Sequence, residues 1–305
     1  IGGSFTALGI NVGHGMPIST ETGLPNTAFP IADGSIDASI VDGNGGWYVS
    51  GNFTHIGGLD RRFIARILSD GTVDAGWNPN VASAFDGGVY ALSLSGTALF
   101  VGGGFDGFIA KILENGTIDT SWNPEVDGQV STIVALPQGV YIGGYFSNVG
   151  LTERLHAAEL AADGSVMDWN PAPDDTVIVL ALSGSTMYMG GDFTHVGLNA
   201  IQHLAAVGTD GTVDSDWAPN PNSHVNAIVP SPGALYIGGD FTDVNGSPAA
   251  YLTALDGNGN VKSGWDNVSD YTVYSLLLSG STLYIGGSFG LIQGEERGCL
   301  AAMDT

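Results

Sequence analysis

Carboxylates are the only abundant reactive side chains in this sequence, with 31 acidic residues among 305. Hydrolysis of a glycosidic bond uses two carboxyl groups, held about 5–10 Å apart in environments that separate their roles. The candidates for such a pair are Asp174, Asp175, Asp192, Asp216, Asp240, Glu295 and Glu296. Because so many carboxylates make some pairing expected by chance, a carbohydrate-active enzyme is an alternative to a binding protein and not the leading hypothesis.

A calcium site is a second use for these oxygen atoms. Asp256-Gly-Asn-Gly-Asn260 alternates Asp or Asn with glycine, and Asp42-Gly-Asn44 is a shorter copy of the pattern. Ca²⁺ prefers hard oxygen ligands on turns of this kind. However, Val261 stands where an EF-hand loop requires glycine, which favours an elongated hairpin turn. Asp256, Asn258 and Asn260 are therefore the candidate ligands of Ca²⁺, and no other cofactor is indicated.

Aromatic side chains outside the core could stack on sugars. Tyr145 is the main candidate for ligand binding, because it replaces a small or acidic residue in a recurring glycine motif. Other aromatic residues could reach a loop face: Trp47, Tyr90, Tyr251 and Tyr271. Trp47 and Tyr90 fall in expected strands, so we predict that they pack against neighbouring residues.

The histidines give weaker evidence for a functional site. They are His14, His55, His156, His195, His203 and His224. His55 and His195 follow the same Phe-Thr pair, which indicates inheritance through a repeat rather than a pair of metal ligands. The sequence contains no zinc-protease or serine-hydrolase motif, no phosphate-binding loop and no Cys/His cluster.

The charge balance excludes one class of partner and disfavours another. Only seven Lys and Arg residues stand against the 31 acidic ones, for a net charge of −24. Nucleic-acid binding requires a cationic footprint, and an anionic membrane surface is disfavoured for the same reason. No apolar stretch reaches 18 residues, so we expect no membrane insertion. The acidity indicates solubility, cation binding or a saline extracellular setting.

Two features of the sequence concern its context. Cys299 is the only cysteine, which excludes an intramolecular disulfide. The sequence opens at Ile1 within a repeat, so we interpret it as a processed or clipped part of a longer chain whose other domains are among its partners.

A repeated motif organises the whole sequence. An apolar run, a glycine pair or its variant, one variable residue and Phe recur, with the phenylalanines at 5, 53, 105, 146, 193, 241 and 289. Spacings of 41–52 residues between them are typical of propellers and other repeat architectures. No segment shows a sustained helical period.

Residues 88–124 show one complete unit. The segments 89–94, 98–103, 108–113 and 117–122 are expected to form four strands, and Asn115-Gly116 predicts a type I′ hairpin turn between the last two. A tryptophan closes each unit and predicts a core between blades. These tryptophans are Trp77, Trp122, Trp169, Trp217 and Trp265.

The termini carry partial units. Residues 1–30 align with strands two to four of a unit, and residues 273–305 carry strands one to three. The sequence therefore predicts one all-β domain over residues 1–305, a β-propeller of four-stranded antiparallel blades. Separate partial blades would give seven blades, which we favour, and termini that interleave in one blade would give six.

The repeated frame of Gly-Gly-x-Phe-Thr, Asp-Gly-Thr-Val-Asp and Trp-Asn-Pro resembles the delta-60 repeat family. This family comprises domains predicted to be β-propellers, which occur in large secreted or surface proteins of bacteria. The frame is also similar to the propeller region of fungal cortical polarity-marker proteins. The resemblance covers essentially the whole chain. It implies a secreted or cell-surface setting, often within a longer polypeptide, and it implies no catalytic residues.

Three hypotheses about function follow. The leading one is a non-enzymatic extracellular binding or scaffold module, with a glycan or protein at the loops along the blade edges. The second is the carbohydrate-active enzyme, with Asp or Glu on the top face. The third is a structural spacer or assembly subunit without a small ligand. Calcium binding is compatible with all three.

Overall fold

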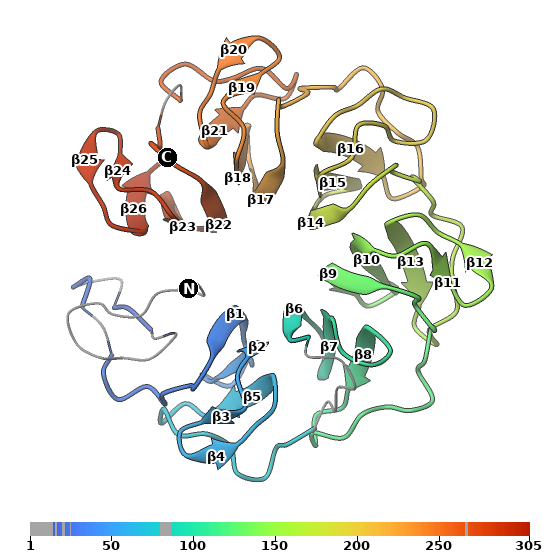
Figure 1. Ribbon diagram of the computed structural model, residues 1–305, viewed down its shortest axis with the longest axis vertical. Helices are drawn as coiled ribbons and strands as arrows, with labels where there is room; N and C mark the ends of the chain where they lie inside the picture. Colours follow the sequence, from blue (N-terminus) through green and yellow to red (C-terminus); the bar gives the residue numbers. More distant parts are fainter. Residues whose placement is uncertain (1–14, 16, 20–21, 25, 80–86, 266–267) are drawn as a thin grey trace. The chain divides into compact units, whose positions relative to one another are not determined.

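The computed structural model describes residues 15, 17–19, 22–24, 26–79, 87–265 and 268–305, and they form strands and turns without a helix (Figure 1). By internal contacts the chain divides into two compact units. Unit 1 holds residues 1–140, 148–151 and 160–166, and unit 2 holds residues 141–147, 152–159 and 167–305. The division neither supports nor contradicts the single domain expected from the sequence.

Six three-stranded antiparallel sheets, which we number as repeats, form most of the structure. Repeat 1 contains β1 (Ser35–Val41), β2 (Trp47–Asn52) and β5 (Ile64–Ile67), and repeat 2 contains β6 (Val89–Ser95), β7 (Ala98–Gly103) and β8 (Ile109–Ile112). Repeat 3 contains β9 (Gln129–Leu136), β10 (Gly139–Tyr145) and β13 (Ala157–Ala161), and repeat 4 contains β14 (Val177–Ser183), β15 (Thr186–Gly191) and β16 (Leu204–Gly208). Repeat 5 contains β17 (Val225–Ser231), β18 (Ala234–Gly239) and β21 (Leu252–Leu255), and repeat 6 contains β22 (Val273–Ser279), β23 (Thr282–Gly287) and β26 (Leu300–Asp304).

The motif glycines end each second strand, where two neighbours leave no room for a side chain. A Cβ on Gly191 would lie 2.1 Å from the carbonyl oxygen of Thr176, the residue before the first strand of the same sheet. A Cβ on Gly190 would lie 2.8–3.0 Å from atoms of Val179 and Val225. The close backbone approach that the glycine pair predicts is therefore present, and the first strand has a β-bulge at that point.

The motif phenylalanines and the closing tryptophans form the core. Each described motif Phe is at most 3% exposed. The tryptophans pack against the following repeat: Gly116 faces the Trp77 ring in unit 1, and Trp169 Nε1 donates a hydrogen bond to the Gly208 carbonyl oxygen at 2.9 Å in unit 2. The predicted core between repeats is thus confirmed.

The fourth strand is shorter than predicted. In repeat 2 it is reduced to one bridge, Ile112 with Ile118. The chain then turns, because the Asp119 carboxylate accepts hydrogen bonds from the amide and hydroxyl of Ser121. The same single bridge recurs in repeats 1, 3, 4 and 5. An aspartate two residues before a small or polar residue favours a turn over strand continuation.

The turn before that bridge also differs from the predicted type I′. Gly116 has φ 82°, but Asn115 has no positive φ. The Gly116 amide donates to the Leu113 carbonyl oxygen, and the Leu113 amide donates to the Thr117 carbonyl oxygen. This is a turn closed by one left-handed glycine, which adds a bulge residue to the hairpin.

Four short hairpins extend from the motif and were not predicted. They are β3 (His55–Ile56) with β4 (Leu59–Asp60), β11 (Asn148–Val149) with β12 (Thr152–Glu153), β19 (Asp243–Val244) with β20 (Ser247–Pro248) and β24 (Leu291–Ile292) with β25 (Glu295–Glu296). They lengthen the path from the second strand to the third in repeats 1, 3, 5 and 6. Repeat 4 has a single bridge there, Val196 with Asn199, and repeat 2 has neither within the described residues. The motif copy at residues 1–5, on which the number of blades partly depends, lies outside the described residues.

Candidate functional site

Three positions of every repeat meet at one edge of its sheet: the residue before the first strand, the residue after the motif glycines, and the residue before the third strand. We call the second the motif position. In repeat 4 its residue, Asp192, donates its amide to the carbonyl oxygen of Thr176 at 2.9 Å, and Asp240 does the same with His224 in repeat 5. Antiparallel pairing thus brings side chains distant in sequence to the same edge.

The residue before the third strand has a left-handed backbone in all six repeats, with φ between 58° and 65°; we call it the left-handed position. Two main-chain hydrogen bonds hold it. In repeat 4 the His203 amide donates to the Phe193 carbonyl oxygen at 2.9 Å, and the Gly191 amide donates to the His203 carbonyl oxygen at 3.1 Å. Such a backbone is unusual for residues other than glycine and is often found at functional sites.

Side chains at these two positions differ between the units. Unit 1 carries Asn52 and Gly104 at the motif position and Phe63 and Phe108 at the left-handed position. Unit 2 carries Tyr145, Asp192, Asp240 and Ser288 at the motif position and His156, His203, Tyr251 and Cys299 at the left-handed position. Groups that hydrogen-bond or stack are therefore concentrated in unit 2.

One histidine joins two of the candidate carboxylates. His224 contacts Asp192 Oδ1 through Nδ1, and its Nε2 lies 3.2 Å from Asp240 Oδ2. Asp240 Oδ1 accepts a hydrogen bond from the Thr272 hydroxyl. His224 and both carboxylates are a third or more exposed. The edge thus presents a continuous row of donors and acceptors across repeats 4 to 6.

Tyr145, the predicted ligand-binding residue, lies beside a buried histidine. Its side chain is 64% exposed, and its ring centroid lies 5.6 Å from that of His156. His156 is only 9% exposed, and its Nδ1 has no hydrogen-bond partner within the described part of the chain. A buried nitrogen without a partner is costly, so this pair offers an aromatic surface next to an unsatisfied polar atom.

A second aromatic pair lies further along the same edge. Tyr251 and Tyr271 stack at a centroid distance of 5.8 Å and an interplanar angle of 25°. Tyr271 is more than half exposed. Together these residues form what we call the polar edge of unit 2. Its members are Tyr145, His156, Asp192, His203, His224, Asp240, Tyr251, Tyr271 and Thr272.

The predicted calcium loop forms a compact turn. Asp256 Oδ1 accepts hydrogen bonds from the amides of Asn258 and Asn260 at 2.9 and 3.0 Å. The bond from Asn260 is the main reason why the pKa of Asp256 lies below its ordinary value. The similar carboxylate of Asp42 is bound by Arg66. No group of three His, Cys, Asp or Glu side chains suited to a metal occurs in the described residues, and the calcium site stays a prediction.

The other candidate carboxylates lie apart from the polar edge or in turns. Asp174 caps the segment after the repeat 4 motif by accepting hydrogen bonds from the amides of Thr194 and His195. Burial alone would raise the pKa of Asp174, but these bonds lower it to about 2. Asp33 forms the same cap with Thr54 and His55. The shared register of His55 and His195 is therefore a structural cap.

The remaining candidate residues lie outside the polar edge of unit 2. Asp175 accepts a hydrogen bond from the Thr176 amide, and Glu295 and Glu296 form the exposed strand β25. Trp47 is about one-third exposed, whereas the Tyr90 hydroxyl accepts a hydrogen bond from the Gly88 amide at 3.2 Å. Cys299 is exposed. His14 lies outside the described residues.

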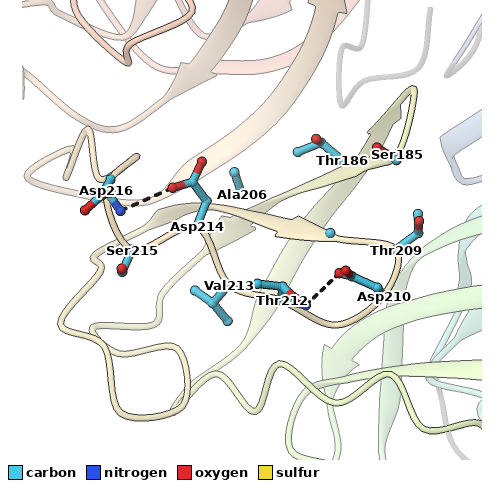
Figure 2. Close-up of a pocket in the computed structure, with 11 residues that line it drawn as sticks. Ser185, Thr186, Ala206, Thr209, Asp210, Thr212, Val213, Asp214, Ser215 and Asp216 are labelled. Carbon is cyan, nitrogen blue, oxygen red and sulfur yellow. Dashed lines mark hydrogen bonds between the residues drawn. The ribbon is translucent and has the colours of Figure 1, made fainter.

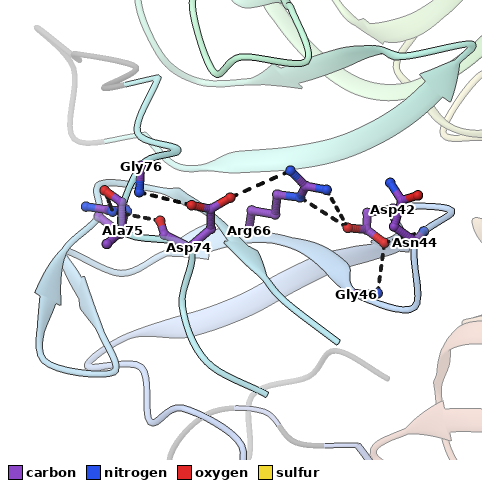
Figure 3. A network of polar contacts seen from close by, with 8 residues as sticks. Asp42, Asn44, Gly46, Arg66, Asp74, Ala75 and Gly76 are labelled. Atoms are coloured by element: carbon purple, nitrogen blue, oxygen red, sulfur yellow. Dashed lines mark hydrogen bonds and ion pairs between the residues drawn. The ribbon is translucent and has the colours of Figure 1, made fainter. Parts of the chain in front are cut away.

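All seven cationic side chains of the chain lie in the described residues and contact other parts of the protein. Arg61, Arg154, Lys262 and Arg297 donate to backbone carbonyls, Arg62 lies over the Phe63 ring, and Arg66 and Lys111 pair with aspartates. Figure 3 shows Arg66 between Asp42 and Asp74. These contacts leave no cluster of exposed cations in the described residues.

A hollow of about 550 Å³ lies in repeat 4, toward the other end of β16 from the polar edge (Figure 2). It is lined by Ala206, Asp214 and Asp216, among others. Asp216 thus lies next to a cavity. Its amide donates a hydrogen bond to Asp214 Oδ1 at 3.2 Å, which places Asp216 in the turn after β16.

Sequence reasoning named most members of the polar edge singly and missed their common register. The signal was present, because the left-handed residue follows the motif Phe by ten positions in every repeat except repeat 2. Phe193 and His203 are one such pair, and Phe241 and Tyr251 are another. Repeat 2 departs because its described residues have neither the short hairpin nor the single bridge of repeat 4.

Comparisons with known proteins show that the fold is a β-propeller. Residues 43–76 match a family model described as a domain of unknown function (DUF5122) β-propeller. A comparison with curated proteins gives no match. Among solved structures, virginiamycin B lyase from Staphylococcus aureus is similar at 13% identity and a TM-score of 0.62, with 88% of this chain and 82% of that chain covered.

Two further structures are similar at comparable identity. The WD40 β-propeller domain of Doa1 is 14% identical with a TM-score of 0.54, over 84% of this chain and 90% of that chain. The extracellular domain of a putative hybrid two component system from B. thetaiotaomicron is 13% identical with a TM-score of 0.53. The match covers 90% of this chain but only 34% of that one.

The described residues contain no helix with the length and apolar character needed to span a bilayer. The β-propeller fold is compatible with a binding module, and the similar structures include both a lyase and the extracellular domain of a putative hybrid two component system.

Proposed function

We propose that this chain is a non-enzymatic extracellular binding module and that the polar edge of unit 2 binds a glycan. The observation that carries the proposal is the concentration of tyrosine, histidine and aspartate at two matched positions of unit 2, where unit 1 has phenylalanine, asparagine and glycine. Exposed aromatic rings give sugars a stacking surface, and a fixed row of polar groups orients their hydroxyls.

The Tyr145–His156 pair supports a ligand with both apolar faces and hydroxyl groups. A sugar ring can stack on the exposed Tyr145 ring, which the neighbouring His156 ring helps to hold in place. The Asp192–His224–Asp240 row supplies acceptors for further hydroxyls. A protein surface is the other class of partner that the exposed tyrosines favour.

Three indirect points support an extracellular setting for this module. The extracellular domain of a putative hybrid two component system is among the similar structures, the chain is strongly acidic, and its repeats resemble those of the delta-60 family in secreted and surface proteins. The same resemblance favours a place within a longer polypeptide.

Binding to a panel of insoluble and immobilised polysaccharides, with calcium and with chelator, tests the proposal. We expect saturable binding to one polymer that falls at least about tenfold in Tyr145→Ala and in Tyr271→Ala, because each loses a stacking surface. Trp47→Ala is the matched control, since it removes an exposed aromatic ring away from the polar edge. Uniform failure to bind, or an equal loss in the control, would contradict the proposal.

An enzymatic alternative rests on one observation. His224 contacts both Asp192 and Asp240, and paired carboxylates are the groups that glycoside hydrolysis requires. If the chain were such an enzyme, Asp192→Asn or Asp240→Asn would abolish release of reducing sugar and leave the melting temperature nearly unchanged. Release that persists in both variants would exclude these residues as the pair.

The calcium prediction enters the same experiment. If Asp256, Asn258 and Asn260 bind Ca²⁺, calcium will raise the melting temperature of the parent and not that of Asp256→Ala. Equal calcium titrations of the two proteins would remove this loop as a site.

A further inference from the structure

In repeats 1 to 5 the residue that follows the single fourth-strand bridge lies opposite a residue of the third strand, and its amide donates to the carbonyl oxygen of that residue. These pairs are Asp74 with Arg66, Asp119 with Lys111, Met167 with Glu159, Asp214 with Ala206, and Lys262 with Ala254. Repeats 1 and 2 therefore place a cation opposite an aspartate. Among these five described pairs, repeat 4 alone keeps the aspartate and lacks a long side chain opposite it.

In repeats 1 and 2 the two carboxylate oxygens have separate roles. In repeat 2, Asp119 Oδ1 holds the turn through the Ser121 amide and hydroxyl, and Oδ2 lies 2.9 Å from Lys111 Nζ. In repeat 1, Asp74 Oδ1 accepts from the Gly76 amide, and Oδ2 lies 3.6 Å from Arg66 Nη1 (Figure 3).

The cation also covers its aspartate and the neighbouring aromatic residue of the second strand. The Asp74 and Asp119 side chains are only 22% and 18% exposed. The Arg66 guanidinium lies 5.7 Å from the centroid of the Tyr48 ring, which is buried. The aspartate, the cation and the ring form one packed group.

Repeat 4 has the same group without its cation. Asp214 Oδ1 holds the turn through the amides of Asp216 and Trp217, as Figure 2 shows for Asp216. Its Oδ2 has no hydrogen bond or ion pair within residues 87–265 and the rest of the described chain. Asp214 is exposed, and Tyr188, which pairs with Ala206, is only half-buried.

The hollow of about 550 Å³ is lined by Ala206, which holds the position that Arg66 and Lys111 hold in repeats 1 and 2. Its walls combine the Asp214 carboxylate with Ala206 and Val213. This is more than a group of acidic residues, because two internal copies of the same position already hold a cation against the same oxygen.

We propose that this hollow of repeat 4 binds an alkylammonium group, with the ammonium at Asp214 Oδ2 and the alkyl chain over Ala206 and Val213. Repeat 2 is the nearer template. Both repeats join their first two strands by a short Ser-Gly turn, at residues 95–97 and 183–185. Repeat 1 instead has a longer turn whose Asp42 supplies a second carboxylate to the guanidinium. Asp210 and Asp216 also line the hollow, but Asp210 Oδ1 accepts a hydrogen bond from the Thr212 amide, and repeat 4 has no counterpart of Asp42. Asp214 therefore matches the one ion pair of repeat 2, which favours a primary ammonium over a guanidinium.

A lysine side chain of another protein and a small diamine share this chemistry. A net charge of −24 attracts either to the protein. The site is separate from the polar edge of unit 2, so it adds a second class of ligand and does not depend on glycan binding.

Titration with Nα-acetyl-lysine N-methylamide, whose side-chain ammonium is free, tests the proposal. Binding is followed through the NMR signals of the Val213 methyl groups and, in the variants that keep it, of the Ala206 methyl group. We expect these signals to shift in saturable fashion and the affinity to fall about fivefold or more in Asp214→Asn, since the charge-assisted hydrogen bond is lost. In Ala206→Lys the new side chain should occupy the hollow, abolish binding and raise the melting temperature.

Asp163→Asn is the matched control, because it removes the same charge from an exposed turn of repeat 3. It should leave the affinity unchanged. Titration with 1,4-diaminobutane separates the sources: equal affinity for both probes indicates a small amine, and tighter binding of the lysine derivative indicates a protein partner. Shifts that do not saturate, or equal affinity in the parent, Asp214→Asn and Ala206→Lys, would overturn the proposal.

Discussion

The left-handed position has the same backbone in both units and opposite side-chain chemistry. In unit 1 it holds Phe63 and Phe108, and Phe63 is 3% exposed and part of the core. In unit 2 it holds His156, His203, Tyr251 and Cys299. The hydrogen bonds that fix the backbone are identical. In each repeat the main chain and the motif residues therefore build the sheet, whereas the side chain at the left-handed position is free to vary. Polar and aromatic side chains suited to ligand binding are concentrated at this position in unit 2.

The largest expected effect tests the shared part of this comparison. Phe53→Ala in unit 1 and Phe193→Ala in unit 2 should each lower the free energy of unfolding by about 3–5 kcal/mol, because both remove a fully buried ring. Chemical denaturation measures both. A difference of more than about 2 kcal/mol between them would show that the motif does not have the same structural role in the two units.

The next effect addresses the position at which the units differ. Phe63→Gly should cost about 2–4 kcal/mol, because the loss of a buried ring exceeds the relief of left-handed strain. His203→Gly should change the free energy of unfolding by at most about 1 kcal/mol, since glycine adopts this backbone without strain and the His203 ring makes one hydrogen bond within the described residues, to the Gly191 carbonyl oxygen. Equal losses of unfolding free energy in the two variants would contradict a core role for Phe63 and a surface role for His203.

A smaller effect concerns the caps that both units share. Asp174→Ala should lower the free energy of unfolding by about 1 kcal/mol at neutral pH, since two amides lose their acceptor. The pKa of Asp174 is about 2 in the folded protein and ordinarily 3.8. The stabilisation is therefore present above pH 4 and lost as the pH falls toward 2.

Denaturation of the parent and Asp174→Ala between pH 7 and pH 2 should give curves that converge at the acid end. Asp33→Ala in repeat 1 should behave alike, because hydrogen bonds from His55 and Thr54 hold the pKa of Asp33 well below its ordinary value despite partial burial. A gap that widens on acidification would contradict the assigned role of the cap.

The smallest expected effect on stability lies at the polar edge itself. His224→Gln should change the free energy of unfolding by less than about 1 kcal/mol, because its ion pairs are partly exposed and solvent screens them. The same variant should reduce glycan binding, since the row from Asp192 to Thr272 loses its central member. A strong loss of stability with unchanged binding would assign His224 to the framework instead.

The sequence predicted the regular part of this fold well. The glycine pair, the buried motif Phe and the tryptophan against the next repeat follow from residue type and spacing, which local sterics and burial determine. The short fourth strand does not, because the Asp119 carboxylate competes with the ladder through a side-chain bond that propensity ignores. Likewise, the glycine at 116 identified a turn without identifying its type.

The polar edge was harder to predict for a different reason. Asp192 and His224 are 32 residues apart, and Tyr251 and Tyr271 are 20 apart, so their contacts exist only after the sheets have packed. The left-handed backbone of His203 is also imposed by two main-chain hydrogen bonds, one to the Phe193 carbonyl oxygen and one from the Gly191 amide, and not by the type of residue that adopts it. The spacing of ten residues from the motif Phe, which every repeat except repeat 2 keeps, was the local signal in the sequence.

The left-handed position has a consequence for how such a chain diversifies. Main-chain groups supply both hydrogen bonds that hold His203, so side chains of different chemistry can occupy this position. Proline is barred because it lacks the amide N–H, and β-branched residues are disfavoured because the φ is positive. Phenylalanine, histidine, tyrosine and cysteine already occupy it in this one chain. Each copy of the repeat therefore offers one position whose side chain can change without a change of backbone. Single substitutions at these positions could alter the binding specificity while the sheets keep their structure.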